Sequence, residues 1–168
     1  MGVVTLSLDG IVVQDAAGTT LQTSAFTDPD ATLALLVSLT GTTPMPTEYP
    51  DFGSTTWEWP GLLFGRTSED FSWLRSESAE IGGLPLQTAA GIQVGSSRGD
   101  VILQSPYDGN YDMDGDGESD LYGLEQRTND EYESLEFPGL PGTEFIEVQL
   151  DGDVVSVLRA PSNDYSDV

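Results

Sequence analysis

A stretch of nine residues places acidic side chains at regular intervals along a glycine-containing segment. Its candidate metal ligands are Asp112, Asp114, Asp116, Glu118 and Asp120. Oxygen ligands at its first, third, fifth and ninth positions, with glycine at the sixth, match the beginning of an EF-hand-like calcium loop. Calcium prefers six to eight hard oxygen ligands, which such spacing folds inwards around one ion. The sequence therefore predicts a weak calcium site as its only cofactor site.

The loop also departs from the calcium-binding pattern. The twelfth position, where a bidentate glutamate is expected, holds Gly123, and the nearest acid is Glu125. No convincing helix precedes the segment. The alternative interpretation is an acidic, solvated turn between strands, which is an ordinary feature in a chain this rich in carboxylates.

Three tryptophans form the second set of candidate residues, namely Trp57, Trp59 and Trp73. They alternate with other residues on predicted neighbouring strands, so they either pack in the core between sheet and helix or form an exposed strip that grips a partner or a sugar. We take them as the candidate partner-binding residues. One face of each strand must be the core, so at most a few aromatic side chains are free.

The residue types needed for most enzyme mechanisms are missing. The chain contains no histidine, cysteine or lysine, which excludes a Ser-His-Asp triad, a thiol nucleophile, a Schiff base and a P-loop. Carboxylate pairs drawn from Glu58, Glu133 and Glu136 could serve a glycosidase. On antiparallel strands, however, such residues usually face water. The sequence predicts a protein that is not an enzyme.

The overall charge restricts the partners. Five arginines oppose 29 carboxylates, which gives a net charge of −24. This surface repels phosphate backbones and anionic lipids, so we expect no nucleic-acid binding. The longest apolar run, 33–39, is far shorter than the roughly 20 residues that span a bilayer, so we expect no membrane insertion. Such acidity suits either a salt-adapted organism or a secreted protein of a high-GC bacterium.

The first half of the chain predicts a β-meander, a helix and more strands. Asp9-Gly10 predicts a hairpin turn. Asp28-Pro29-Asp30 predicts the start of a helix, with Asp28 as its cap, and Gly41 predicts its end. A proline-containing loop follows. The predicted strands are Val3–Leu8, Ile11–Gln14, Thr19–Ala25, Thr55–Trp59, Leu62–Arg66 and Phe71–Glu77.

The second half repeats this order of a helix followed by strands. Gly82-Gly83 is interpreted as a joint, Ser96 or Ser97 caps a short helix, and Asp151-Gly152 predicts a hairpin turn. The predicted strands are Tyr132–Phe137, Glu144–Leu150 and Val154–Arg159. We therefore expect a single acidic α+β domain over residues 1–168. Antiparallel sheets would carry one or two short helices on one face, possible halves are 1–81 and 84–161, and 162–168 would form a frayed tail.

Part of this pattern resembles known proteins. The segments 88–101 and 150–161, together with 56–62, resemble uncharacterised secreted proteins and lipoproteins of actinobacteria. The segment 88–101 is also similar to the repeat of the β-lactamase-inhibitory-protein and SmpA/OmlA-like fold. The resemblance covers residues 55–161 and implies binding to proteins or envelope components, without catalytic residues. The chain departs from it by lacking the inhibitory proteins' disulfides and the lipoproteins' lipidated cysteine.

These observations predict an exported, non-enzymatic binding domain with a protein partner, located outside the cell or attached to its envelope. No leader is visible at the start of the sequence, so a leader would have to be missing from it. The alternative is a structural protein of a salt-adapted organism or its virus, such as a decoration or tail component, with calcium as a staple.

Overall fold

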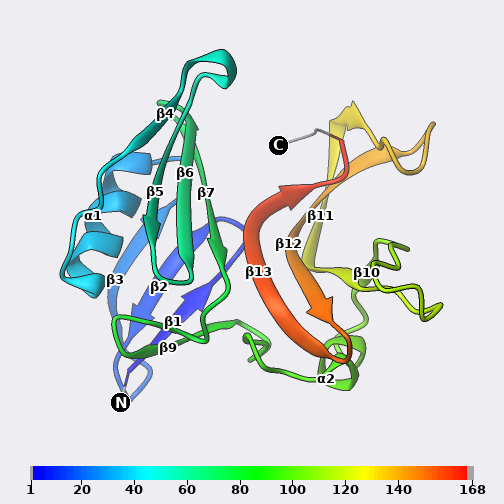
Figure 1. Cartoon of the computed structure of the whole chain (residues 1–168), viewed down its shortest axis with the longest axis horizontal. Coiled ribbons are helices and arrows are strands. Elements are labelled where there is room, and N and C mark those ends of the chain that lie inside the picture. The colour runs from blue at the N-terminus through cyan, green and yellow to red at the C-terminus, as the bar shows by residue number, and fades with distance from the viewer. Residues whose placement is uncertain (1, 166–168) are drawn as a thin grey trace.

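The computed structural model describes residues 2–165, which fold into two sheets and two short α-helices (Figure 1). The predicted α+β class is confirmed, and the pairing is antiparallel except between β1 and β9. The elements in chain order are β1 (Val3–Leu6), β2 (Gly10–Gln14), β3 (Thr20–Ala25), α1 (Pro29–Thr40), β4 (Thr47–Tyr49), a 3₁₀ turn (Pro50–Phe52), β5 (Ser54–Trp59), β6 (Leu62–Ser68), β7 (Phe71–Ser76), β8 (Glu80–Ile81), β9 (Leu84–Thr88), α2 (Arg98–Ile102), β10 (Tyr107–Asp108), β11 (Leu121–Glu133), β12 (Pro141–Asp151) and β13 (Val154–Asn163).

Helix α1 begins and ends where the sequence predicts, and α2 begins after Ser97, one of the two predicted caps. The Asp28 carboxylate accepts a hydrogen bond from the Ala31 N–H at 3.1 Å, and Gly41 ends α1 in the left-handed conformation that glycine adopts readily. Ser97 caps α2, and a reciprocal bond from the Ser97 N–H to Asp100 completes a capping box. Local capping chemistry therefore fixes both helices.

The two sheets draw strands from both ends of the chain. The five-stranded sheet has the order β3-β2-β1-β9-β8, and the eight-stranded sheet has the order β10-β11-β12-β13-β7-β6-β5-β4. Because β9 pairs with β1 and β13 pairs with β7, each of the two halves considered from the sequence contributes to both sheets. Gly82-Gly83 lies in the hairpin turn between β8 and β9, not at a joint between halves.

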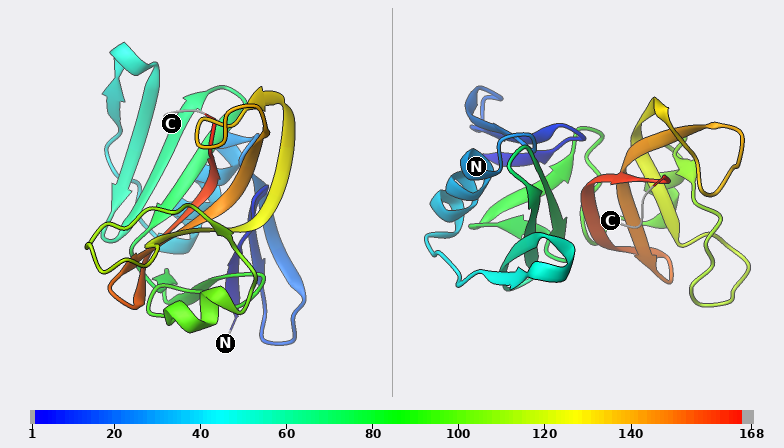
Figure 2. Two further views of the ribbon diagram at one scale, coloured as in Figure 1. Left: turned by 90° about the vertical axis from the view of Figure 1, so that its right-hand side faces the viewer. Right: turned by 90° about the horizontal axis from the view of Figure 1, so that it is seen from above.

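One hydrophobic core joins the two sheets and α1. Helix α1 contacts β3 and β8, which are the two edge strands of the smaller sheet. Seen from above, the N-terminal elements and the strands β11–β13 lie at opposite ends of the molecule (Figure 2). Buried side chains from the smaller sheet, α1 and one face of the larger sheet form a single cluster, which includes Leu6, Ile11, Leu36, Phe64, Leu74 and Ile146.

Two predicted segments near the C-terminus are corrected. The strand predicted at Tyr132–Phe137 is wrong, because β11 ends at Glu133 and the chain then turns back towards β12. The second part of β11 is polar and lacks the alternating apolar residues from which a strand is predicted, so the sequence did not indicate it. The frayed tail is wrong for 162–165, since β13 extends to Asn163 and Asp164 accepts a hydrogen bond from the Thr143 N–H. Residues 166–168 lie outside the described part.

Candidate functional site

The two faces of the eight-stranded sheet separate the three candidate tryptophans. Trp59 is only 6% exposed and belongs to the core, where its indole N–H donates to the Thr42 carbonyl at 3.1 Å. Trp57 is half-buried against the same core and packs on Phe64 with ring centroids 5.6 Å apart. This burial leaves little of Trp59 or Trp57 for the partner-binding role that the sequence predicts. Trp73 points to the opposite face.

That opposite face, called here the open face, is marked by a continuous row of neighbouring residues. Successive strand pairings place each member opposite the next, and directly paired residues of a sheet point to the same side. The row runs through Glu58, Leu63, Arg75, Arg159, Glu147, Gly123 and Tyr107, from β5 to β10. Two of the chain's five arginines therefore stand side by side in its centre.

At the β5–β7 end, the open face is organised around Trp73. Its indole lies over Gly65 on β6, where an added Cβ would come within 2.2 Å of the ring carbons. The guanidinium of Arg159 lies over the same ring, 5.0 Å from its centroid, in a cation–π contact. Trp73 therefore holds an internal cation in place.

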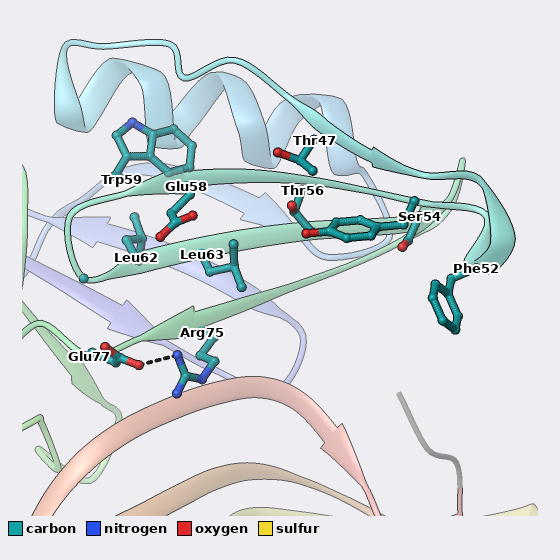
Figure 3. A pocket seen from close by; sticks show the side chains of 12 residues that line it. Thr47, Phe52, Ser54, Thr56, Glu58, Trp59, Leu62, Leu63, Arg75 and Glu77 are labelled. Carbon is teal, nitrogen blue, oxygen red and sulfur yellow. Dashed lines mark hydrogen bonds and ion pairs between the residues drawn. The ribbon is translucent and has the colours of Figure 1, made fainter.

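The same end holds a first hollow of about 490 Å³, which is lined by Glu58, Leu63 and Arg75 of the row. Figure 3 shows Glu58 and Leu63 along it, with Phe52 at its outer end. The Arg75 guanidinium donates to the Glu77 carboxylate at 2.5 Å (Figure 3). The cation in this hollow thus already has an anionic partner.

At the β10–β13 end, the open face is organised around Phe145. Its ring lies over Gly123 on β11, where an added Cβ would come within 2.7 Å of the ring. Tyr107 stacks on Phe145 with centroids 5.1 Å apart and planes 18° apart, and Phe137 meets Tyr107 edge-on at 6.3 Å. Three aromatic rings therefore gather where the other end has one ring and one cation.

A second hollow of about 460 Å³ adjoins these rings and is lined by carboxylates. Glu147 is 7% exposed, and its carboxylate accepts hydrogen bonds from Gln149 Nε2 at 2.5 Å and Ser162 Oγ at 2.8 Å. Glu136 accepts a hydrogen bond from the Tyr107 hydroxyl. Burial and this neighbouring carboxylate raise the pKa of Tyr107 above its usual range.

The acidic loop brings together three of the five predicted metal ligands. Carboxylate oxygens of Asp112, Asp114 and Asp116 all lie within 4.8 Å of one another, and these residues are exposed. The Asp112 carboxylate also accepts hydrogen bonds from the Gly115 N–H at 2.6 Å and the Gly117 N–H at 3.0 Å. The three carboxylates could thus provide part of a cation's coordination shell.

The structure places Glu118 and Asp120 elsewhere, against Arg98. Asp120 is 1% exposed, and one of its oxygens accepts from Arg98 Nη2 at 3.0 Å while the other accepts from the Met113 N–H at 2.8 Å. Glu118 lies 3.4 Å and Asp153 2.9 Å from Arg98 Nε. Asp120 is therefore the anchor of the loop and is not part of the three-carboxylate cluster.

Electrostatics around Arg98 favour the charged forms. Burial alone would raise the pKa of Asp120, yet the Met113 N–H and the Arg98 guanidinium hold it below its usual range. Burial alone would also lower the pKa of Arg98, but its bonds to Asp153 and Asp120 raise it. The ion pair therefore stays charged and fastens α2 and the β12–β13 hairpin to the loop, since Arg98 also donates to the Gly152 carbonyl.

Sequence reasoning missed Arg98, Phe145, Tyr107 and Glu147. The sequence contains one indication of the role of Arg98. Only five residues of this acidic chain are basic, so each of them is a candidate for a structural role. The other three become neighbours only through strand register, which no local pattern encodes.

Comparisons with protein-family models, curated proteins and solved structures find no match. The resemblance to secreted actinobacterial proteins and to the β-lactamase-inhibitory-protein fold therefore stays a prediction. Within residues 2–165, neither helix combines the length and the hydrophobicity that crossing a bilayer requires.

Proposed function

We propose that the chain is a non-enzymatic binding domain that contacts a protein partner through the open face of its eight-stranded sheet. The observation that carries this proposal is the row from Glu58 to Tyr107, which joins two hollows across one face. Partly exposed apolar, aromatic and charged groups gathered on one surface are typical of protein interfaces. We place this activity outside the cell or at its envelope, as the sequence resemblance implies.

Affinity capture from an envelope extract tests the proposal. Leu63→Glu puts a charge on the open face at its β5–β7 end, whereas Leu21→Glu puts one on β3, where Leu21 is 61% exposed. A specific partner should be retained by the wild type and by Leu21→Glu and lost with Leu63→Glu, with circular dichroism confirming that all three are folded. Equal capture by both variants would refute the role of the open face. Turnover of a substrate that one carboxylate replacement abolishes would refute the proposal that the chain is not an enzyme.

We also propose a weak calcium site at Asp112, Asp114 and Asp116. Their converging oxygens support it, since calcium binds carboxylate oxygens. The same loop favours the alternative function, a calcium-stapled structural protein of a salt-adapted organism or its virus. A salt series separates the two functions, because a salt-adapted protein should unfold below about molar salt as self-repulsion is unmasked, and a bacterial secreted domain should stay folded.

A further inference from the structure

We propose that the second hollow, between β10–β13 and the 134–140 turn, binds a basic side chain of the partner, a guanidinium or an ammonium group. This inference rests on the proposed binding function and names the chemistry that the site recognises. The hollow, at about 460 Å³, falls within the range of about 300–1,000 Å³ that is usual for ligand pockets. It is large enough to admit one long side chain.

The walls of the hollow suit an organic cation. The half-buried Tyr107, which stacks on the buried Phe145, lines it together with the exposed Tyr111 of the acidic loop. Aromatic faces attract a cation through their quadrupole, most strongly where water is excluded. A bare metal ion would instead need six or more oxygen ligands, which aromatic walls do not supply.

The carboxylates of the hollow receive neutral hydrogen-bond donors. Those of Glu147 come from Gln149 and Ser162, and that of Glu136 comes from the Tyr107 hydroxyl. Asp164 accepts from Ser134 Oγ at 2.8 Å and from the Thr143 N–H at 2.6 Å. No arginine is among the residues that line the hollow, although Arg159 faces Glu147 from the neighbouring strand.

The three carboxylates differ in burial, since Glu147 is 7% exposed, Asp164 is half-buried and Glu136 is exposed. Carboxylates removed from water are stabilised when a cation reaches them, and a charge-assisted bond is stronger than a neutral one. A basic side chain that enters between the rings and the carboxylates would bring a cation to the carboxylates and form charge-assisted hydrogen bonds with them.

The first end of the open face shows that the fold accommodates such a contact. There the Arg159 guanidinium lies 5.0 Å from the centroid of Trp73, which rests on Gly65. Phe145 rests on Gly123 in the same way. The chain's own cation, Arg159, contacts Trp73 and also faces Glu147, and we infer that a partner supplies a further cation beside Glu136 and Asp164.

A pair of blocked tripeptides tests the inference. One is acetyl-Gly-Arg-Gly-amide, and the other carries citrulline, which has nearly the same shape as arginine but no charge. Titration into isotopically labelled protein at about 0.15 M salt, where screening acts over about 8 Å, should shift the amide signals of Gly109, Tyr111 and Phe145. The arginine peptide should bind at least tenfold more tightly than the citrulline peptide.

Two matched variants locate the site. Glu136→Gln removes a charge from the hollow, and Glu131→Gln removes one from the exposed part of β11. We expect the first to weaken the arginine peptide at least threefold and the second to leave its affinity unchanged. Equal binding of both peptides, equal losses in both variants, or shifts confined to other surfaces would overturn the inference. If capture of the partner still depends on Leu63 in that case, the proposed binding function stands without this ligand.

Discussion

At one end of the open face a tryptophan lies on a glycine and carries an arginine, and at the other a phenylalanine lies on a glycine and carries a tyrosine. The two hollows beside them are of similar size, about 490 and about 460 Å³. They differ in charge, because Arg75 offsets Glu77 at the first and leaves Glu58 as the one remaining carboxylate, whereas Glu136, Glu147 and Asp164 line the second without an arginine. The comparison shows that strand pairing sets a glycine beneath an aromatic ring at both ends, whereas the placement of a few arginines sets the charge of each hollow.

Among the proposed variants, Arg98→Gln should destabilise the β10–β13 end of the open face the most. It leaves Asp120 buried beside Glu118 and Asp153 without a cation, which should lower the free energy of unfolding by about 3–5 kcal/mol. Chemical denaturation measures the loss. Arg66→Gln is the control, since its pair with Asp30 is solvent-exposed and contributes about 0–1 kcal/mol. Similar losses from both variants would show that Arg98 does not anchor the loop.

Asp120→Asn should weaken the same anchor in a pH-dependent way. Near neutral pH we expect a loss of about 1.5–3 kcal/mol, typical of a hydrogen bond to a charged group. Because folding lowers the pKa of Asp120, its contribution is complete above the unfolded value near 4 and is lost as the pH falls through the folded value. Urea unfolding from pH 7 to 2.5 should show the variant approaching the wild type. A constant gap throughout would count against the ion pair.

Glycine replacements compare the two ends directly. Gly65→Ala and Gly123→Ala each force a Cβ into an aromatic ring and should destabilise by about 1–3 kcal/mol. Gly99→Ala is the control, because its Cβ would meet only Ser97 Oγ at 3.6 Å. Thermal unfolding should show the control unchanged or slightly stabilised. An unchanged melting temperature for either test variant would mean that its aromatic ring is not held in place by the glycine.

Calcium should have the smallest effect. For a dissociation constant of about 1 mM, 10 mM calcium stabilises the folded state by about 1.4 kcal/mol. The double variant Asp112→Asn/Asp114→Asn should abolish this gain, and Asp130→Asn/Glu131→Gln on β11 should keep it. Differential scanning fluorimetry measures both. No shift with the wild type at 10 mM calcium would remove the site.

Capping and turn chemistry made part of the fold predictable. Asp28, Gly41 and Ser97 act within one or two helical turns, so local sequence was enough. The same local logic failed for Tyr132–Phe137, where β11 continues through polar residues because β12 pairs with it. Cross-strand pairing is a property of the whole sheet, which local patterns do not specify.

The candidate site was predictable to a smaller degree. The spacing of Asp112, Asp114 and Asp116 was visible, whereas the diversion of Asp120 to Arg98 joins residues 22 positions apart. The open face could not be predicted, since the side to which Trp59 and Trp73 point depends on which face of the sheet meets the core.

Side-chain footprinting with hydroxyl radicals, on the protein alone and with its captured partner, tests the role of the open face most directly. Leu63, Trp73 and Tyr107 should lose reactivity in the complex, while Leu21 on the other sheet should keep it. Protection of Leu21 with unchanged reactivity of Leu63 and Tyr107 would contradict the account.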